Sequence, residues 1–243
     1  MEKGERIAKI IARAGICSRR DAEKLIESGK VEVNGSKIKS PALNVTSRDE
    51  VFVEGKKLPV YEGSRLWMYY KPVGIVTTHK DEQGRKTVFD DIPKYLPRMV
   101  SVGRLDLNTE GLMLLTNDGE IARHIELPST GWKRRYRVRI YGLDSADRLE
   151  RIKHGVTIDG ITYGKVEVEL EKHDKNTKNI WAIVTICEGK NREIRKLFEH
   201  IDCKVSRLIR IGYGAFQLGN MKAGEIKEVP RKVLLSQLGK LVK

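Results

Sequence analysis

A short polar loop between two apolar segments is the first place where this sequence could do chemistry. The stretch "SVGRLDLNTEGLMLLTNDGE" carries Arg104 and Asp106 just before the continuous apolar run 112–115. That run predicts a short strand buried on both faces, and residues 99–102 predict another. A carboxylate beside a buried strand is costly unless a positive group holds its charge. Asp106 is therefore either a candidate catalytic carboxylate or part of a solvated connecting loop, and from this stretch alone the connecting loop is the commoner case.

The overall charge points to a polyanionic partner. Lys and Arg number 47 against 33 Asp and Glu, which gives a net charge of +14 at pH 7. A chain this basic usually binds nucleic acid, and the clustering of its charges favours that interpretation over a surface that is basic only for solubility. With 243 residues, 40% of them hydrophobic, the chain can form one large domain or two of ordinary size.

Other classes of protein are disfavoured by what the sequence lacks. It has no apolar run of about 18 residues that could span a bilayer, and its charged start is unlike a signal peptide. Cys17, Cys187 and Cys203 are far apart, which predicts free thiols in a reducing compartment. The five histidines form no cluster, and no phosphate-binding loop or dinucleotide fingerprint is present. We therefore expect a cytoplasmic protein with no membrane partner, no metal and no cofactor.

The N-terminal part has the pattern of a small separate module. Residues 5–15 and 18–29 carry apolar residues at helical spacing. The segment "KVEVNGSKI" alternates around an Asn-Gly turn, which predicts a hairpin, and "DEVFVEGKKL" predicts a further strand and turn. "PVYEGS" then has the composition of a linker. The predicted domains are residues 1–60 and residues 65–243.

Two arginines of this module indicate a binding role. Ser18 and Asp21 form a capping pair for the predicted second helix, and Arg19 and Arg20 occupy its first turn. Positive charge there opposes the helix dipole at a cost on the order of 0.5 kcal/mol per residue. Contact with RNA explains these residues better than stability does. Further basic residues of the two helices either complete a basic face or form a solvated charged surface: Arg6, Lys9, Arg13 and Lys24.

From residue 65 onward the sequence is rich in strand patterns. "RLWMYYKPVGIVTT" predicts a strand, a turn and a second strand, and "KRRYRVRIYG" alternates with Tyr136, Val138 and Ile140 on one face. "YGKVEVELEKH" and "NIWAIVTICEG" predict antiparallel neighbours, and "VSRLIRIGYG" predicts a further strand. Helical spacing occurs in "GEIARHIELP" and "REIRKLFEHI". The order predicts an α+β fold, in which a helix-helix-hairpin module precedes a mixed, mainly antiparallel sheet with flanking helices.

Two sets of motifs resemble known families. "ARAGICSRRDAEKLIESGKVEVNG" resembles the RNA-binding domain named after ribosomal protein S4. "YYKPVGIVTT", "VGRLDLNTEGLMLLTNDGE", "RRYRVRIYG" and "EGKNREIRKLFEHIDCKVSRLIRIGYG" follow it in one order, and together they resemble an RNA pseudouridine synthase of the RsuA/RluB type. Glu193, where the small-subunit branch more often has Gln, makes the sequence more similar to the RluB branch, which acts on large-subunit ribosomal RNA.

The resemblance implies a reaction and its catalytic residues. A uridine of ribosomal RNA is isomerised when the bond from ribose C1′ to uracil N1 breaks and the base is reattached through C5, without a cofactor. Asp106 corresponds to the catalytic carboxylate, which attacks the ribose, attacks the base or promotes elimination to a glycal. Arg195 would be its guanidinium partner, Tyr136 would stack on the target uracil, and Arg104 would enter the RNA stack as the uridine is flipped out.

The remaining implied site residues contact RNA phosphates: Arg19, Arg20, Lys71, Lys133, Arg135 and Arg192. The expected partner is ribosomal RNA, with the large subunit favoured, either free or in a partly assembled subunit, and we expect a monomer. The alternatives are a small-subunit ribosomal RNA pseudouridine synthase and a non-catalytic RNA-binding or ribosome-assembly factor. A pure RNA binder has no use for Asp106, which repels phosphate. A glycosidase or nuclease would need paired acids or metal ligands, which the sequence does not show.

Overall fold

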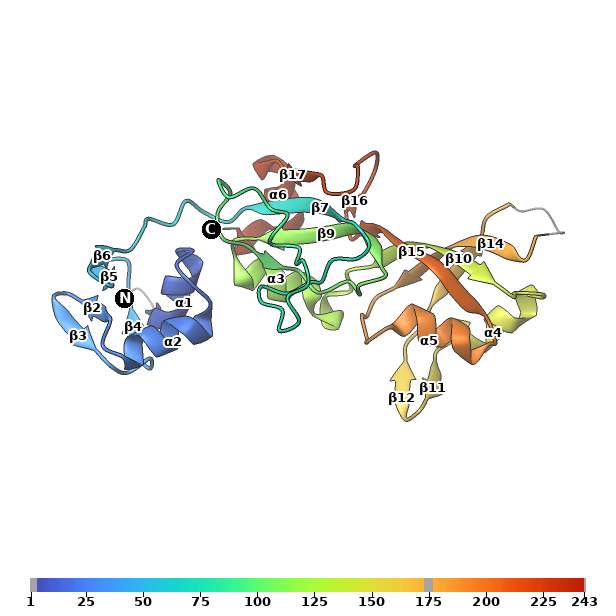
Figure 1. The fold of residues 1–243 in the computed structure, drawn as a ribbon, viewed down its shortest axis with the longest axis horizontal. Helices are drawn as coiled ribbons and strands as arrows, with labels where there is room; N and C mark the ends of the chain where they lie inside the picture. Colours follow the sequence, from blue (N-terminus) through green and yellow to red (C-terminus); the bar gives the residue numbers. More distant parts are fainter. Residues whose placement is uncertain (1–3, 173–176, 243) are drawn as a thin grey trace.

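The computed structural model describes residues 4–172 and 177–242. The N-terminal module (blue) lies at one end of an elongated molecule, and a long linker connects it to the central sheet (Figure 1). The sheet and its flanking helices form the rest of the described chain, which confirms the predicted α+β architecture.

The N-terminal module contains the predicted helices α1 (Ile7–Arg13) and α2 (Arg19–Glu27). Ser18 caps α2, because its Oγ accepts a hydrogen bond of 3.1 Å from the Asp21 backbone N–H. The helices share a core with a sheet of order β3-β2-β5-β6, as the alternating patterns predict. The module's strands are β1 (Glu5–Arg6), β2 (Val31–Val33), β3 (Ser36–Ile38), β4 (Asn44–Val45), β5 (Val51–Val53) and β6 (Lys56–Lys57). The pair β1–β4 was not predicted, since two residues are too few to show alternation.

The large domain is built on one mixed sheet, of order β13-β14-β10-β15-β9-β7-β17, with β8 paired to β9 and β16 to β15. Its strands are β7 (Leu66–Lys71), β8 (Val100–Ser101), β9 (Glu110–Thr116), β10 (Arg134–Tyr141), β13 (Glu167–Leu170), β14 (Asn179–Ile186), β15 (Lys204–Tyr213), β16 (Phe216–Gln217) and β17 (Ile226–Glu228). In the described sheet β9 and β15 pair in parallel and the other neighbours are antiparallel, which confirms the predicted mixed, mainly antiparallel sheet. His173, the last residue of the predicted strand "YGKVEVELEKH", lies outside the described residues.

Helices flank this sheet, and a hairpin projects beside one of them. The helical elements are α3 (Gly119–Glu126), α4 (Glu150–Lys153), α5 (Glu193–His200), α6 (Arg231–Leu238) and three 3₁₀ turns, η1 (Pro128–Thr130), η2 (Ala146–Leu149) and η3 (Gly239–Leu241). In Figure 1, α3 lies beside β9, whereas α5 lies beside the half of the sheet that contains β10 and β15. The hairpin of β11 (Val156–Ile158) and β12 (Ile161–Tyr163) projects next to α5.

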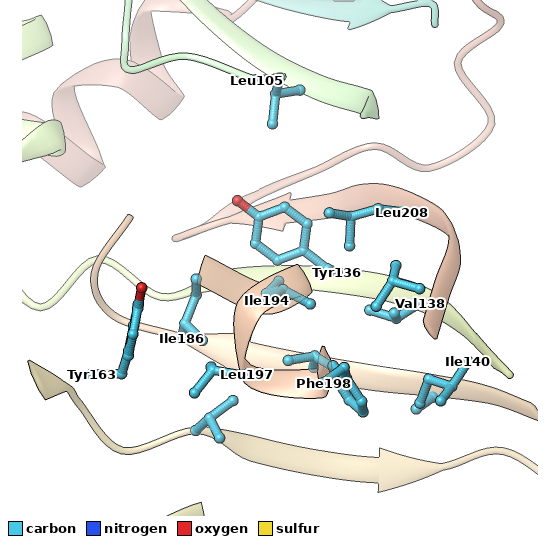
Figure 2. Packing of buried hydrophobic residues seen from close by; sticks show 14 of the residues in the cluster. Leu105, Tyr136, Val138, Ile140, Tyr163, Ile186, Ile194, Leu197, Phe198 and Leu208 are labelled. Carbon is cyan, nitrogen blue, oxygen red and sulfur yellow. The ribbon is translucent and has the colours of Figure 1, made fainter. Parts of the chain in front are cut away.

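Strand β9 is buried along its whole length, which confirms the expectation of a strand covered on both faces. Leu112 and Leu114 belong to the apolar cluster of α3 and α6, whereas Met113 and Leu115 belong to the cluster that continues to α5. Successive residues of a strand point to opposite faces, so β9 joins the two halves of the core. Figure 2 shows the α5 side of this packing around Tyr136.

The parallel contact between β9 and β15 depends on Gly111. This residue pairs with Arg210 and has a φ of +104°, a conformation that side chains disfavour. A Cβ atom at this position would lie 2.4 Å from the carbonyl oxygen of Arg210 and 2.8 Å from its nitrogen. Glycine therefore allows the backbones to approach, and the loop before β9 is brought next to β15.

One predicted strand is absent. The segment "GIVTT" follows the predicted turn, but Val76 forms only an isolated bridge with Thr87. The hydroxyls of Thr77 and Thr78 donate to the carbonyls of Leu105 and Lys80, at 3.0 and 2.8 Å. Such side-chain bonds to the backbone compete with a strand ladder.

We expect Gly111→Ala to lower the free energy of unfolding by about 2–4 kcal/mol, because the strained φ and the overlap with backbone atoms cannot be relieved by a rotamer change. Gly74→Ala is the matched control, since Gly74 has a φ of +89° but no atom within 4 Å of the position that a Cβ would occupy. Its cost should be about 1–2 kcal/mol, from the backbone conformation alone. Urea unfolding measures both values, and equal losses for the two variants would contradict the role of Gly111.

Candidate active site

A cleft of about 1000 Å³ opens where the loop before β9 meets β10, β15 and the start of α5. Four of the predicted site residues line it together: Arg104, Asp106, Tyr136 and Arg192. Arg195 and Lys71 lie next to it without lining it, as described below. Arg19, Arg20, Lys133 and Arg135 are on the surface elsewhere.

The loop that carries Asp106 is anchored on both sides of this residue. Leu105 is buried in the core, and its carbonyl oxygen accepts a 3.0 Å hydrogen bond from Thr77 Oγ1. The Asp106 carbonyl accepts a 3.0 Å bond from the Thr109 N–H, which closes a tight turn. Asp106 itself is half-buried and faces the cleft, whereas Arg104 is exposed. The loop therefore presents a carboxylate at a fixed position.

Tyr136 combines a core position with access to the cleft. Its ring packs with Ile194 and Leu208, and Leu105 extends toward it from the opposite wall (Figure 2). The side chain is 7% exposed, and this small exposed part lines the cleft. The strand alternation predicted the buried face correctly, and the cleft adds a surface on which a planar base could stack.

The predicted direct ion pair between Arg195 and Asp106 is not formed among the described residues. Arg195 instead donates hydrogen bonds of 2.9 Å to the carbonyls of Val205 and Asn108. Burial lowers the pKa of Arg195, and the charge of Asp106 acts in the opposite direction, so the two groups interact through space. Because Asn108 belongs to the same loop as Asp106, the Arg195 side chain fixes the backbone of that loop to α5.

Lys71 does not fit the predicted phosphate contact, because its side chain is completely buried. Its ammonium donates to the carbonyls of Thr109 and Pro72, at 2.9 and 3.0 Å. Burial lowers the pKa of Lys71 to about 8, against the opposing charges of Asp106 and Glu110. The sequence contains a signal for this position, since alternation from Trp67 and Tyr69 places Lys71 on the buried face of β7.

A second acidic site in the cleft was missed by sequence reasoning. Glu193, at the start of α5, is 4% exposed, and its Oε2 accepts a 2.9 Å bond from the Lys190 N–H. Burial and the neighbouring charge of Glu188 together raise the pKa of Glu193 to about 7, against the lowering effect of the hydrogen bond from the Lys190 N–H. Glu188 pairs with Lys190 and accepts a 2.7 Å bond from the Gly164 N–H on the β11–β12 hairpin. Only the fold brings these carboxyl groups together.

The basic side chains at the start of β10 point alternately to the two faces of the sheet. Arg135 is exposed, and Lys133 forms an exposed ion pair of 3.1 Å with Glu167. Arg134 is buried on the opposite face, so it cannot contribute to the same surface. Arg137 pairs with Glu171 at 2.7 Å.

The N-terminal module keeps two of its basic residues available. Arg19 and Arg20 are exposed, and in the described part of the chain neither forms a salt bridge. Lys9 and Arg13 instead each pair with Glu5 at 2.6 Å, and Lys9 also contacts Glu120 on α3. The continuous basic face considered from the sequence is thus reduced to the start of α2 and its surroundings.

Residues 4–172 and 177–242 contain no group of three or more His, Cys, Asp or Glu side chains arranged to hold a metal ion. None of the helices in these two ranges is long and apolar enough to cross a membrane.

A small helical module joined to a mixed sheet with a carboxylate in its cleft has a counterpart among known families. Residues 65–200 match the family model of RNA pseudouridylate synthases, and residues 5–51 match that of the S4 domain. The chain therefore belongs to the RNA pseudouridylate synthase family, an enzyme family, which confirms the predicted family and class.

Individual relatives are similar along most of the chain. An uncharacterized RNA pseudouridine synthase of Rickettsia felis is 52% identical over 95% of this chain and 99% of its own length. Ribosomal large subunit pseudouridine synthase B of Buchnera aphidicola is 41% identical over 90% and 88% of the two chains, and that of Yersinia pestis is 40% identical over 88% and 69%. A crystal structure of a pseudouridylate synthase superposes with a TM-score of 0.64 at 26% identity, covering 94% and 97%. The predicted resemblance to the RluB branch is confirmed.

We expect Glu193→Gln to raise the thermal stability at high pH only. The folded-state pKa of about 7 lies above the ordinary value of 4.5. The contribution of Glu193 to the free energy of unfolding is therefore fully present below pH 4.5 and is lost as the pH rises through 7. The Gln variant should melt about 2–4 °C above the wild type at pH 8, which corresponds to about 1 kcal/mol, and at the same temperature at pH 4.5. Glu199→Gln, on the exposed side of the same helix, is the control and should match the wild type at both pH values. A gain for Glu193→Gln that is equal at both pH values would show that burial of charge is not its cause.

Proposed function

We propose that this protein isomerises a uridine of ribosomal RNA to pseudouridine and that its substrate is large-subunit ribosomal RNA. The substrate is supported by the relatives named ribosomal large subunit pseudouridine synthase B, at 40–41% identity over most of this chain. The observation that carries the site is the presence of Asp106 and Tyr136 in one cleft within the matched family region.

In this proposal Asp106 is the group that acts on the uridine. A half-buried carboxylate on an anchored loop is placed to attack ribose C1′ or the base, or to promote elimination, without first being reorganised. The flipped uracil stacks on Tyr136, the aromatic surface in the cleft. Arg104, exposed two residues before Asp106, fills the space that the flipped base leaves in the RNA, and Arg192 contacts the backbone at the rim.

The charge of Asp106 is supported without a direct ion pair. The ammonium of Lys71 and the guanidinium of Arg195 both interact electrostatically with it, and each holds a carbonyl of the same loop. These hydrogen bonds hold the loop, and with it the carboxylate, in place. We assign Lys71 and Arg195 as positioning residues.

The S4-like module supplies affinity in this proposal, with Arg19 and Arg20 as exposed phosphate contacts. The same module and the charge of +14 would also suit a non-catalytic RNA-binding factor. The carboxylate in the cleft favours the enzyme, because a pure binder gains nothing from a negative group among basic ones. Small-subunit ribosomal RNA is the alternative substrate, and the experiment below includes it.

We expect Asp106→Asn to fold and bind RNA but to lose turnover. The amide keeps the shape of the side chain and is cheaper to bury, but it cannot act as the carboxylate. The assay is tritium release from ribosomal RNA labelled at uracil C5, with large-subunit and small-subunit RNA tested separately, beside a filter-binding titration at matched salt. Wild type should release tritium from the large-subunit RNA. Activity of the Asn variant within about tenfold of wild type, only ~1.4 kcal/mol of barrier, would remove Asp106 from the catalytic role.

We expect Arg195→Ala to slow the single-turnover rate by about 100-fold, because the loop loses its bond at Asn108 and Asp106 moves. RNA affinity should change by less than about threefold, since Arg195 does not line the cleft. Lys196→Ala on the same helix is the control for general damage to α5. An unchanged rate combined with weak binding would make Arg195 a phosphate contact instead.

A further inference from the structure

The floor of the cleft includes two arginines and two tyrosines from neighbouring strands. On β10 and β15, Arg134 pairs with Tyr213 and Tyr136 pairs with Arg210, with a shift of register between Arg135 and Tyr136. Residues directly opposite each other on paired strands point to the same face. All four paired residues line the cleft, and their exposed fractions are 6% for Arg134, 7% for Tyr136, 2% for Arg210 and 1% for Tyr213.

The two buried guanidinium groups lie 4.8 Å (Arg134) and 5.0 Å (Arg210) from the centre of the Tyr213 ring, but their hydrogen bonds differ. Arg134 donates to the carbonyls of Cys187 and Glu126, at 2.6 and 2.9 Å, and to the Tyr213 hydroxyl at 2.8 Å. These bonds tie β10 to α3 and explain Arg134 as a structural residue.

The guanidinium of Arg210 has a hydrogen-bond acceptor for only some of its donors. Its Nε donates a 2.6 Å bond to the Leu112 carbonyl, whereas Nη2 is buried with no hydrogen-bond partner in the described structure. Within the described residues no carboxylate forms a salt bridge with Arg210. A buried charged donor without an acceptor is costly, so a ligand in the cleft that brought an acceptor to Arg210 would be stabilised by it.

We propose that Arg210 is a further catalytic residue, whose Nη2 donates to a carbonyl oxygen of the flipped uracil and stabilises negative charge on the base. This inference rests on the proposed function. A uracil stacked on Tyr136 would have its edge beside Arg210, because the two residues are direct cross-strand neighbours on the cleft face. The RNA phosphates are the less suitable partner, since they remain at the rim with the exposed Arg104 and Arg192, whereas Arg210 is 2% exposed on the floor.

The reaction places negative charge where this donor lies. When the C1′–N1 bond breaks, its electron pair stays on the uracil and is shared by N1, O2 and O4. The same pair forms the new bond from C5 to C1′, after which C5 loses its proton and N1 gains one. The net change is an isomerisation, with no oxidant or reductant. A fixed donor in a dry site stabilises such a transient anion more strongly than it stabilises the neutral base.

The test compares Arg210→Met with wild type on two transcripts of the large-subunit ribosomal RNA, one made with uridine and one with 5-fluorouridine. Fluorine withdraws electrons and stabilises the uracil anion by itself. The variant should therefore lose less of its single-turnover rate on the 5-fluorouridine transcript than on the uridine transcript. Single-turnover loss of the starting nucleoside is measured by nuclease digestion and mass spectrometry, with filter binding in parallel. On uridine the variant should be slower by about 10²–10³-fold, the usual effect of one such donor. On 5-fluorouridine its loss should be at least about tenfold smaller, with RNA affinity nearly unchanged.

Arg210→Lys and Arg134→Lys keep the charge and protect the test against misfolding. Arg210→Lys should show the same difference between the two transcripts to a smaller extent. Arg134→Lys should lower the single-turnover rate equally on both transcripts, because Arg134 acts through the fold. Equal losses on both transcripts for the Arg210 variants would overturn the inference, as would weakened binding at an unchanged rate, which indicates a phosphate contact. A wild type that converts neither ribosomal RNA would overturn the proposed function and this inference with it.

Discussion

The close approach of two backbones at Gly111 and Arg210 is the constraint on which the rest of this structure depends. It joins β9 to β15 in parallel, so the antiparallel halves of the sheet become one surface with a core on each side. It also brings the loop before β9 next to β10 and β15, so that Asp106 and Tyr136 line one cleft. A Cβ atom at residue 111 would overlap the backbone of Arg210, so a side chain there would strain this contact.

Four buried or half-buried cations in and beside the cleft donate hydrogen bonds to backbone carbonyls, which are neutral acceptors: Lys71, Arg134, Arg195 and Arg210. A cation bound to carbonyls is held in place without occupying the oxygens of a nearby carboxylate. A carboxylate clamped in a bidentate ion pair would have its lone pairs occupied. Lys71 and Arg195 therefore hold the loop that carries Asp106 while leaving the oxygens of this residue available.

Sequence patterns correctly predicted the features that depend on a single strand or helix. The burial of β9, the alternation around Tyr136, the Ser18 cap and the mixed sheet were all present in local periodicity. The pairing of Arg195 with Asp106 that the resemblance implies is present as an electrostatic interaction and not as a direct ion pair in the described structure, because the guanidinium donates to the carbonyls of Val205 and Asn108. The Glu188–Glu193 contact and the unpartnered donor of Arg210 could not be predicted, since they arise where separate elements meet. The alternation of β7 indicates that Lys71 is buried, but this signal is easily missed, because lysine is seldom buried.

Helix α3 connects the RNA-binding module to the floor of the cleft. At its start Asp118 caps the helix and accepts hydrogen bonds from Ser64 and from Tyr61 of the linker, at 2.8 and 3.2 Å, while Glu120 contacts Lys9 of the module. At its end the carbonyls of residues 125 and 126 hold the tyrosine and arginine side chains of the floor. Eight residues of helix span about 12 Å, so a single rigid element separates the two regions. Contacts with the N-terminal module and contacts with the floor of the cleft therefore lie at the two ends of the same short helix.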